Sequence, residues 1–324
     1  MGTYVRTQSI DHPIGEHGSV SLELSEGDIQ IRGVPGGDAH VRATFEIRAS
    51  SDADADRLFE AIQLRVTRAS GELRMAEPGS DPTLGTMISR ILGISGHAEV
   101  TVEAEVPANA RLKLTSVSAD TEVTGTHGEQ RYNAVSGDLQ LRDVGGSVRL
   151  ETVSGDATIR ANRPLAAHAQ AVSGDVSITA PMLRSLKANT VSGDVELEAE
   201  LDARGDFRVD TVSGDLVVGL LGDATFEVHG ISTDVSCELD HRLEGQVDRR
   251  RLIIGRGGPR LVFNSMSGDV DVRRPRRIVV VEKGTAPAPA PSVPDQATQL
   301  EVLRALERGE IDVDEATRRL AGGA

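Results

Sequence analysis

The tripeptide Ser-Gly-Asp recurs along this chain at nearly constant intervals. Counted on its serine, the motif stands at Ser136, Ser154, Ser173, Ser192, Ser213 and Ser267, with the degenerate forms "SAD" at Ser118 and "STD" at Ser232. Successive motifs are 18 to 21 residues apart up to Ser232, and the last interval is 35 residues. A period of this size indicates a repeat protein whose units contact mainly their neighbours.

Each unit carries two short alternating patterns. Apolar residues stand three and five places after each Ser, at Leu139/Leu141, Ala157/Ile159, Val176/Ile178, Val195/Leu197, Leu216/Val218, Val235/Cys237 and Val270/Val272. A second alternation precedes the motif, although Gln130/Tyr132 and Ala167/Ala169 fit it poorly. Both patterns predict strands with one buried face. One unit cannot enclose a core, so we predict an all-β fold: a β-solenoid (β-helix) of 18–21-residue two-strand coils, with a small α-helical C-terminal tail.

The motif itself is interpreted as a backbone corner. Glycine supplies a conformation with φ > 0, and the flanking Ser and Asp can bond nearby backbone groups. The predicted structural turns are Gly137, Asp138, Gly155, Asp156, Gly174, Asp175, Gly193, Asp194, Gly214, Asp215, Gly268 and Asp269. An alternative remains open, in which the row of surface Asp residues binds Ca²⁺ or serves a carbohydrate-active β-helix enzyme.

The composition disfavours catalysis. Aromatic residues make up 2% of the chain, and Phe207, Phe226 and Phe263 fall on predicted interior positions, which leaves little to form a platform for sugar rings. No His/Glu metal motif, nucleophile elbow or phosphate loop is present in the sequence. The single cysteine, Cys237, is interpreted as a small buried apolar residue. We therefore expect no enzyme, no catalytic residue, no cofactor and no metal.

The net charge of the chain limits the classes of partner that it can bind. A formal net charge of −15 disfavours wholesale binding to nucleic acid or anionic membrane. The local exception is a cluster of arginines near the last coil, which is either solvated charge that blocks edge pairing or a docking patch for an anionic partner. Its members are Arg249, Arg250, Arg251, Arg256, Arg260, Arg273, Arg274, Arg276 and Arg277.

Four segments follow from composition and pattern. Residues 1–110 are expected to form an N-terminal β cap and early strands, with an apolar insertion at 83–96 and a short helix within 52–66. Residues 111–281 hold the solenoid repeats, and the Ala/Pro-rich segment 282–294 is a linker. Residues 295–324 are expected to form a helical hairpin that binds a protein partner or self-associates through Leu300, Leu303, Leu306, Ile311 and Leu320.

The first residues hold no basic region followed by an apolar one, and the chain contains no run of about 18 apolar residues. The sequence therefore predicts a cytoplasmic protein without a transmembrane segment. The near absence of Lys beside abundant Arg suggests a bacterial source.

The segment "AEVTVEAEVPANARLKLTSVSADTEVTG", the following "VSGD" units and the tail "GEIDVDEA" at 309–316 together resemble the bacterial "putative adhesin" β-strand-repeat family, domain of unknown function 4097. The resemblance covers roughly residues 98 to 280 and the tail. It implies a β-helical fold accompanied by a short helical hairpin, and a noncatalytic scaffold or protein-interaction module, with some relatives in envelope-stress or surface-sensing systems. It brings no catalytic residues with it.

Overall fold

The computed structural model describes residues 2–78, 98–246 and 249–275, all within one compact unit that spans residues 1–277. In these ranges the chain is nearly all β, with 20 strands in one sheet and one helix. The strands of the first part are β1 (Gly2–Pro13), β2 (Ser19–Val34), β3 (Asp38–Ala49), β4 (Arg65–Ala69), β5 (Glu72–Ala76), β6 (Ala98–Pro107), β7 (Arg111–Thr124), β8 (Glu129–Ser136), β9 (Leu139–Thr152) and β10 (Ala157–Ser173). The others are β11 (Val176–Ser192), β12 (Val195–Leu201), β13 (Phe207–Asp210), β14 (Leu216–Leu220), β15 (Ala224–Ser232), β16 (Val235–Cys237), β17 (His241–Gln246), β18 (Arg249–Ile254), β19 (Arg260–Ser267) and β20 (Val270–Arg273).

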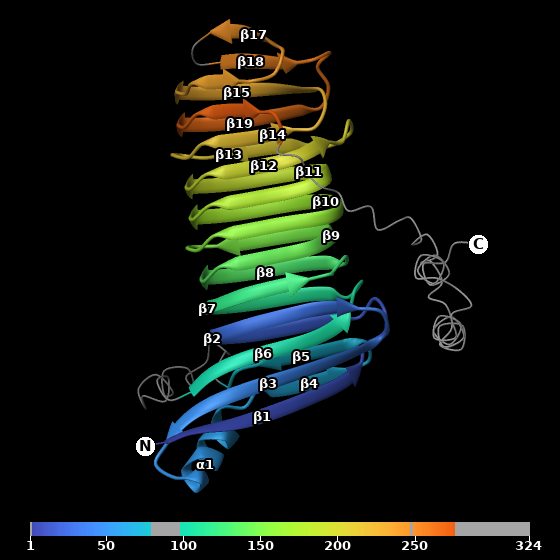
Figure 1. The fold of residues 1–324 in the computed structure, drawn as a ribbon, viewed down its shortest axis with the longest axis vertical. Helices are drawn as coiled ribbons and strands as arrows, with labels where there is room; N and C mark the ends of the chain where they lie inside the picture. The colour runs from blue at the N-terminus through green and yellow to red at the C-terminus, as the bar shows by residue number, and fades with distance from the viewer. Residues whose placement is uncertain (1, 79–97, 247–248, 276–324) are drawn as a thin grey trace, which may run out of the picture. The chain divides into compact units, whose positions relative to one another are not determined.

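Successive repeat units pair in parallel, each one period from the next (Figure 1). Ile159 of β10 lies beside Leu141 of β9 and Ile178 of β11, and Leu197 and Val218 continue the same column. We call the segment from one Ser-Gly-Asp corner to the next a coil. Each coil therefore receives its backbone hydrogen bonds from the coils above and below it, as the alternating patterns predict.

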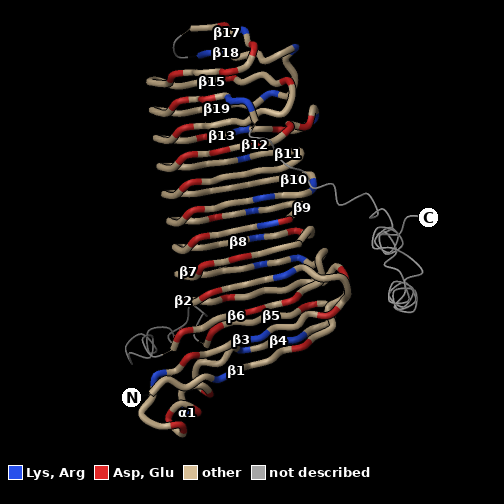
Figure 2. Tube along the Cα trace, in the orientation of Figure 1, with Lys and Arg blue, Asp and Glu red and all other residues tan. Residues whose placement is uncertain are grey.

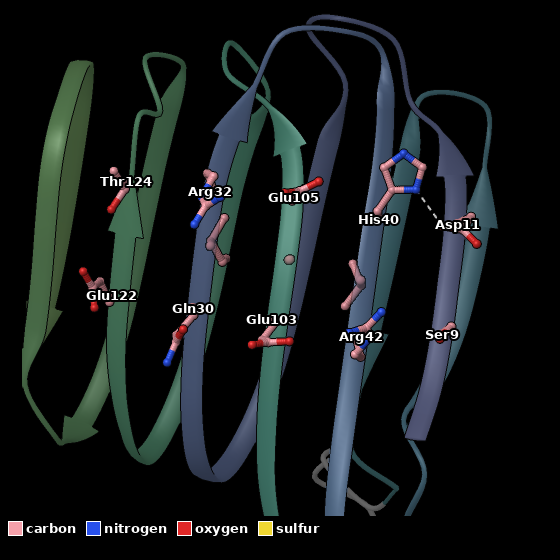
Figure 3. Close-up of a pocket in the computed structure, with 13 residues that line it drawn as sticks. Ser9, Asp11, Gln30, Arg32, His40, Arg42, Glu103, Glu105, Glu122 and Thr124 are labelled. Atoms are coloured by element: carbon pink, nitrogen blue, oxygen red, sulfur yellow. Dashed lines mark hydrogen bonds and ion pairs between the residues drawn. The ribbon is translucent and has the colours of Figure 1, made fainter. Parts of the chain in front are cut away.

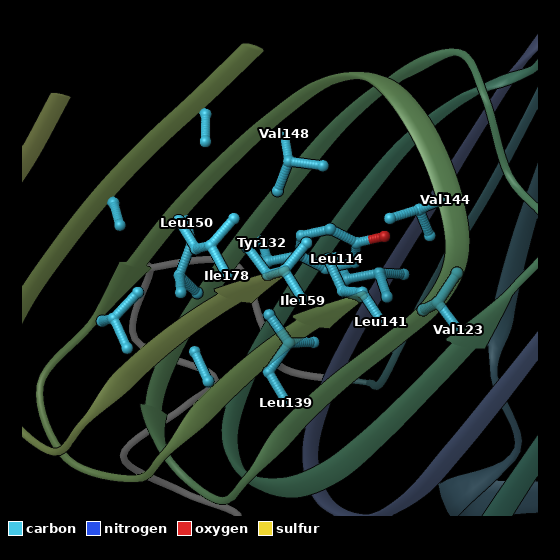
Figure 4. Packing of buried hydrophobic residues seen from close by; sticks show 14 of the residues in the cluster. Leu114, Val123, Tyr132, Leu139, Leu141, Val144, Val148, Leu150, Ile159 and Ile178 are labelled. Carbon is cyan, nitrogen blue, oxygen red and sulfur yellow. The ribbon is translucent and has the colours of Figure 1, made fainter. Parts of the chain in front are cut away.

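The core lies between the two strand segments of each coil. Leu141 from the segment after the corner and Leu150 from the segment before the next one are both fully buried (Figure 4). Val, Leu, Ile and Ala fill most of the interior, and Phe207, Phe226 and Phe263 lie inside it with no exposed surface. The predicted interior position of these three rings is thus confirmed.

The poorly fitting pair Gln130 and Tyr132 also points inward, and both side chains are buried. The hydroxyls of Thr126 and Tyr132 each donate to Oε1 of Gln130 at 2.9 Å, and Nε2 of Gln130 donates to the carbonyl of Gly145 at 3.1 Å. A hydrogen-bonded cluster here replaces the aliphatic pair of other coils, because buried polar groups need partners.

The N-terminal segments combine antiparallel and parallel pairs. β1 and β6 both pair antiparallel with β3, while β2 lies parallel to β6, β5 and β7. Helix α1 (Asp52–Ile62) begins at Ser51, whose side chain accepts a hydrogen bond from the backbone N–H of Asp54. Its Phe59 meets Phe45 edge to face, with ring centroids 5.4 Å apart. The helix expected within 52–66 is therefore confirmed over its first eleven residues, and the chain enters β4 at Arg65.

The last coils do not follow chain order. β19 lies between β13 and β15, and β20 lies between β14 and β16, all in parallel pairing. The intervening β17 and β18 form an antiparallel hairpin whose inner strand, β18, pairs with β15. This excursion accounts for the 35-residue interval between Ser232 and Ser267.

Several predicted features lie outside the described residues. They are the insertion at 83–96, the linker at 282–294, and the hairpin at 295–324 with Leu300, Leu303, Leu306, Ile311 and Leu320.

Candidate functional site

The Ser-Gly-Asp corners stack into a continuous row in which each carboxylate accepts a backbone hydrogen bond from the neighbouring corner. The backbone N–H of Asp175, for example, donates to Oδ1 of Asp156. Seven such bonds of 2.7 to 3.0 Å connect, in spatial order, Asp120, Asp138, Asp156, Asp175, Asp194, Asp215, Asp269 and Asp234. We call these eight residues the Asp row. One oxygen of each carboxylate from Asp120 to Asp269 is thereby committed to holding the next corner.

Glycine is required at the corners because the backbones approach each other closely. A Cβ on Gly174 would stand 2.3 Å from the carbonyl oxygen of Gly155, and the other corner glycines meet the preceding corner at 2.1 to 2.4 Å. Four of the six, Gly137, Gly155, Gly174 and Gly193, also have φ between 103° and 146°. The expectation of φ > 0 is wrong for Gly214 and Gly268, which are not among the positive-φ glycines. At these two corners the close approach alone excludes a side chain.

An aliphatic side chain stands exposed immediately before each corner serine. Val153, Val172 and Val191 are each 48% exposed, an unusual state for a β-branched apolar residue repeated coil after coil. We name this series the aliphatic ladder; in spatial order it comprises Val117, Val135, Val153, Val172, Val191, Val212, Met266 and Ile231. A contiguous row of exposed apolar groups of this kind is uncommon on the surface of a soluble monomer.

A shallow groove of about 420 Å³ runs beside the middle of the ladder. One side of the groove is lined by the ladder residues Val153, Val172 and Val191. The other side is lined by a polar column that consists of Asn133, Glu151, Gln170 and Asn189. Buried residues such as Thr152 and Thr190 lie between the two columns in the sequence. The groove crosses β8, β9, β10 and β11, and so spans four successive coils. It can receive side chains from a partner that lies along the stack.

The corner edge is also acidic. All eight members of the Asp row are exposed, and none of the eight four-residue corners from the ladder residue to the Asp contains Lys or Arg. Figure 2 shows acidic residues gathered at the same end of successive coils. Apolar and negative groups therefore run side by side along one edge.

The sequence reasoning did not identify the aliphatic ladder, although its signal is present. Ala134, Thr152, Ala171 and Thr190 lie two places before their Ser, in phase with the inward positions. The next residue must therefore point outward, because side chains alternate along a strand. An apolar residue on the outward phase in every unit is the sign that was available.

A second hollow, of about 610 Å³, lies on the outer surface of the N-terminal strands. Figure 3 shows its side chains rising from the neighbouring strands β1, β3, β6, β2 and β7. Nδ1 of His40 lies 2.6 Å from Oδ1 of Asp11, and this hydrogen bond raises the pKa of His40. Charges of both signs, from Arg32, Arg42 and Glu103 among others, line an open polar surface here.

The predicted arginine cluster is largely neutralised by its own neighbours. Of its described members, Arg250, Arg251, Arg256, Arg260 and Arg273 form ion pairs, at 2.5 to 3.8 Å, with Asp234, Glu227, Asp223, Glu227 and Asp271 respectively. Nε of Arg249 donates to Nε2 of His229 at 3.3 Å, whereas Arg276 and Arg277 lie outside the described residues. An anionic partner at this cluster stays a prediction.

Other candidate chemistry is sparse in the described part of the chain. Those residues contain no group of three His, Cys, Asp or Glu side chains arranged to hold a metal ion, and none of their helices is long and apolar enough to cross a membrane. Cys237 is half-buried near the end of the stack, where burial raises the pKa of its thiol.

Comparison with solved structures finds folds of low sequence identity. A "putative adhesin" from Bacteroides fragilis NCTC 9343 is 10% identical, with 83% of this chain and 97% of that chain covered and a TM-score of 0.49. A "putative lipid binding protein" from Parabacteroides distasonis ATCC 8503 is 11% identical with the same coverage and a TM-score of 0.46. A "putative cell adhesion protein" from Clostridium sporogenes ATCC 15579 is 9% identical, with 83% and 100% covered and a TM-score of 0.25. No curated protein matches the chain.

The sequence profile of one family, Toastrack DUF4097, matches residues 94–187 and 173–273. These two overlapping stretches cover more than half of the chain, and they contain the corners from Ser118 to Asp269. The protein therefore belongs to the Toastrack (DUF4097) family.

Proposed function

We propose that this protein is a noncatalytic β-solenoid scaffold that binds a protein partner along its corner edge. The observation that carries the proposal is the aliphatic ladder, which keeps eight apolar side chains 45% to 77% exposed in a line. Exposed apolar groups are normal when scattered, but a contiguous row has a cost in solubility that a binding role explains. The backbone pairing above and below each coil makes the row rigid, so little ordering is needed when a partner binds.

The carbohydrate-active or Ca²⁺-binding alternative would use the same Asp residues differently. A glycosidase needs two carboxylates set across a substrate, and Ca²⁺ needs several convergent oxygens. In the Asp row, Oδ1 of each residue from Asp120 to Asp269 accepts a backbone N–H of the next corner. The interior position of Phe207, Phe226 and Phe263 also removes these rings from any sugar platform. Both observations favour the scaffold.

The tail extends the proposal. Its Leu300, Leu303, Leu306, Ile311 and Leu320 recur at helical spacing after an Ala/Pro-rich linker. A tethered hairpin of this kind would bind a partner or a second copy at raised local concentration. Light scattering of the full chain and of residues 1–281 tests self-association through the tail. Fewer chains per particle after truncation would support it, and the same number of chains per particle in both proteins would contradict it.

The setting of the scaffold is part of the same proposal. The proposal includes a link to envelope-stress signalling, because some members of the family that the sequence resembles belong to such systems. A cytoplasmic location is part of this proposal. Fractionation of the source cells tests the location, and recovery of the protein outside the cytoplasm would contradict it.

Site-specific photo-crosslinking tests the binding edge. A benzophenone amino acid replaces Val172 of the ladder in the full chain inside its source cells, and a matched variant carries it at Val5, an exposed valine of β1. We expect a discrete protein adduct from position 172 and none from position 5. Equal adduct patterns at the two positions, or none at either, would contradict the proposed function.

A further inference from the structure

We infer that the aliphatic ladder and the Asp row together dock a cationic amphipathic helix that lies along the stack of coils. The inference rests on the proposed function, because it assigns a partner chemistry to the same edge. It commits to a helix with one apolar stripe and with Lys or Arg beside that stripe.

Charge selects the sign of the partner. In each corner the ladder residue and the Asp are three residues apart, so their Cα atoms are separated by at most about 10 Å. Every apolar group of the ladder thus has a carboxylate within reach of a Lys or Arg side chain on a bound helix. Of the Asp row, Asp234 has an ion pair within the described part of the chain, with Arg250 at 3.8 Å. The row offers its remaining carboxylates to cations from outside.

The spacing of the ladder selects a helix. Adjacent parallel strands lie about 4.8 Å apart, so the ladder presents one aliphatic group at about this interval. The apolar stripe of an α-helix recurs about every 5.4 Å, whereas side chains on one face of an extended strand recur about every 6.8 Å. Across the four coils of the groove the accumulated mismatch is about 2 Å for a helix and about 6 Å for a strand. A helix therefore stays in register with the ladder where a strand does not.

The groove gives the apolar side chains of that helix a place to enter. Its volume of about 420 Å³ accommodates several Leu-sized groups between the valines and the column that includes Glu151 and Gln170. On the side of the groove opposite the Asp row, Glu151 forms an ion pair with Arg149 at 2.9 Å, so the acidic groups that face a partner are those of the Asp row. An apolar channel with a row of carboxylates along one side complements a helix whose apolar stripe has basic residues along one border.

Two other occupants fit less well. Residues 295–324 of this chain contain seven acidic residues and four Arg, a net charge of −3 (4 − 7), so the tail would bring like charge to the edge. A second copy would set its own Asp row near the first one, which is also repulsive. Both occupants are outcomes of the test below.

The test measures binding of labelled synthetic peptides to the full-length protein by fluorescence anisotropy. The probe is an 18-residue Leu/Lys peptide with Leu at the i, i+3, i+4 and i+7 positions of a helix. Its controls are a peptide of the same composition in an order that destroys the stripe, and a Leu/Glu peptide with the stripe intact. We expect the striped Leu/Lys peptide to bind at least about tenfold more tightly than either control, and its affinity to fall as salt rises.

Two sets of variants separate the apolar and the charged contributions. Val153→Thr/Val172→Thr/Val191→Thr keeps β-branched shape and removes apolar surface, and we expect about tenfold weaker binding with the salt dependence retained. Asp156→Asn/Asp175→Asn/Asp194→Asn keeps an oxygen acceptor for each corner N–H and removes charge, and we expect weaker binding with a flatter salt dependence. Val5→Thr is the matched control, and we expect it to leave binding unchanged. Melting temperatures no lower than that of the wild type show that the variants keep the fold.

The remaining outcomes overturn the inference. Equal binding of the scrambled peptide, tighter binding of the Leu/Glu peptide, or binding that ignores the ladder variants each contradicts it. Peptide binding that appears only after removal of residues 282–324 identifies the tail as the occupant. A dimer that dissociates in the triple valine variant identifies a second copy as the occupant. If no peptide binds while position 172 still crosslinks a partner, the inference fails and the proposed function stands; loss of that crosslink removes both.

Discussion

The backbone N–H of Asp175 donates a hydrogen bond of 2.9 Å to Oδ1 of Asp156, one coil below it. The same contact recurs from corner to corner, so these carboxylates hold the backbone of the next coil in place. A charged acceptor makes this bond stronger than a neutral one.

Asp156→Ala removes the acceptor for the N–H of Asp175 and is expected to lower the free energy of unfolding by about 1 kcal/mol. Asp156→Asn keeps an oxygen acceptor at the same place. Its neutral hydrogen bond is weaker, but relief of the repulsion within the Asp row offsets this loss, so its stability should equal or exceed that of the wild type. Urea unfolding followed by circular dichroism compares the three proteins. Equal losses in the two variants would show that charge, and not the acceptor, stabilises the corner.

Gly174→Ala should be strongly destabilising, because its Cβ would stand 2.3 Å from the carbonyl oxygen of Gly155. Gly36 is the matched control: its φ of 126° is close to the 122° of Gly174, but no atom lies within 4 Å of an added Cβ. We expect Gly36→Ala to cost about 1 kcal/mol from backbone strain, and Gly174→Ala at least about 2 kcal/mol more from the clash. Similar urea midpoints for the two variants would contradict the role of close approach.

Tyr132 should make the protein sensitive to alkali. Burial raises the pKa of Tyr132 above its ordinary value of about 10, so the unfolded chain loses this proton first as the pH rises. The folded state then binds more protons than the unfolded state. Its stability is therefore complete below pH about 10 and falls above it.

In Tyr132→Phe the alkaline decline should be smaller. The variant also loses the hydrogen bond to Gln130, at a cost of about 1 kcal/mol at neutral pH. Urea unfolding at neutral and alkaline pH measures both effects. A decline of equal slope in the variant would assign the alkaline sensitivity to other groups.

His40 should titrate above its ordinary range. The hydrogen bond to Asp11 is the largest cause of its raised pKa, and burial opposes it. An NMR titration of the imidazole should give a pKa above about 6.5 in the wild type. In Asp11→Asn we expect a value closer to 6.5, while an unchanged titration would mean that Asp38 or Glu105 dominates.

Removal of Ca²⁺ should leave the protein unchanged. An oxygen of each carboxylate from Asp120 to Asp269 already accepts a backbone N–H, so the corners need no cation to hold their geometry. We expect the same melting temperature with Ca²⁺, with chelator and with neither. A rise on adding Ca²⁺ that Asp175→Asn abolishes would restore the calcium alternative.

The buried columns could be predicted from the sequence because alternation in a strand leaves little choice. Ile159 and Ile178 recur one period apart with polar neighbours, and the structure places them side by side in the core. Leu252 and Ile254 of β18 are also buried, although no Ser-Gly-Asp motif adjoins their strand. Their partner β15 lies antiparallel to them, a relation that a search for repeats of one direction cannot reveal.

One complete coil escaped detection in the N-terminal region. In β2, Glu26, Gly27 and Asp28 lie beside Ser118, Ala119 and Asp120, so they form a further corner below the first one identified. Glu stands where the other corners have Ser, which hides the motif. The Gly-Asp pair was the part of the signal that remained, because a Cβ at Gly27 would stand 2.0 Å from the carbonyl oxygen of Val100.

The spatial order of the last coils could not have been predicted. Coils of equal length present the same backbone edges, so the hydrogen bonds do not distinguish β13 beside β15 from β13 beside β19. Side-chain packing must decide, and Phe207, Phe226 and Phe263 are interchangeable in kind. The alternation of side chains along each strand predicts that the ladder residues are exposed. It does not predict that they bind a partner.

The position of β19 between β13 and β15 has a consequence for biosynthesis. A chain leaving the ribosome can wind its first coils one upon another, but β15 emerges before the strand on which it must rest. It obtains its parallel neighbour only after residues 260–267 have been made. The end of the stack is therefore completed by a late insertion, which makes its assembly depend on nearly the whole body having been translated.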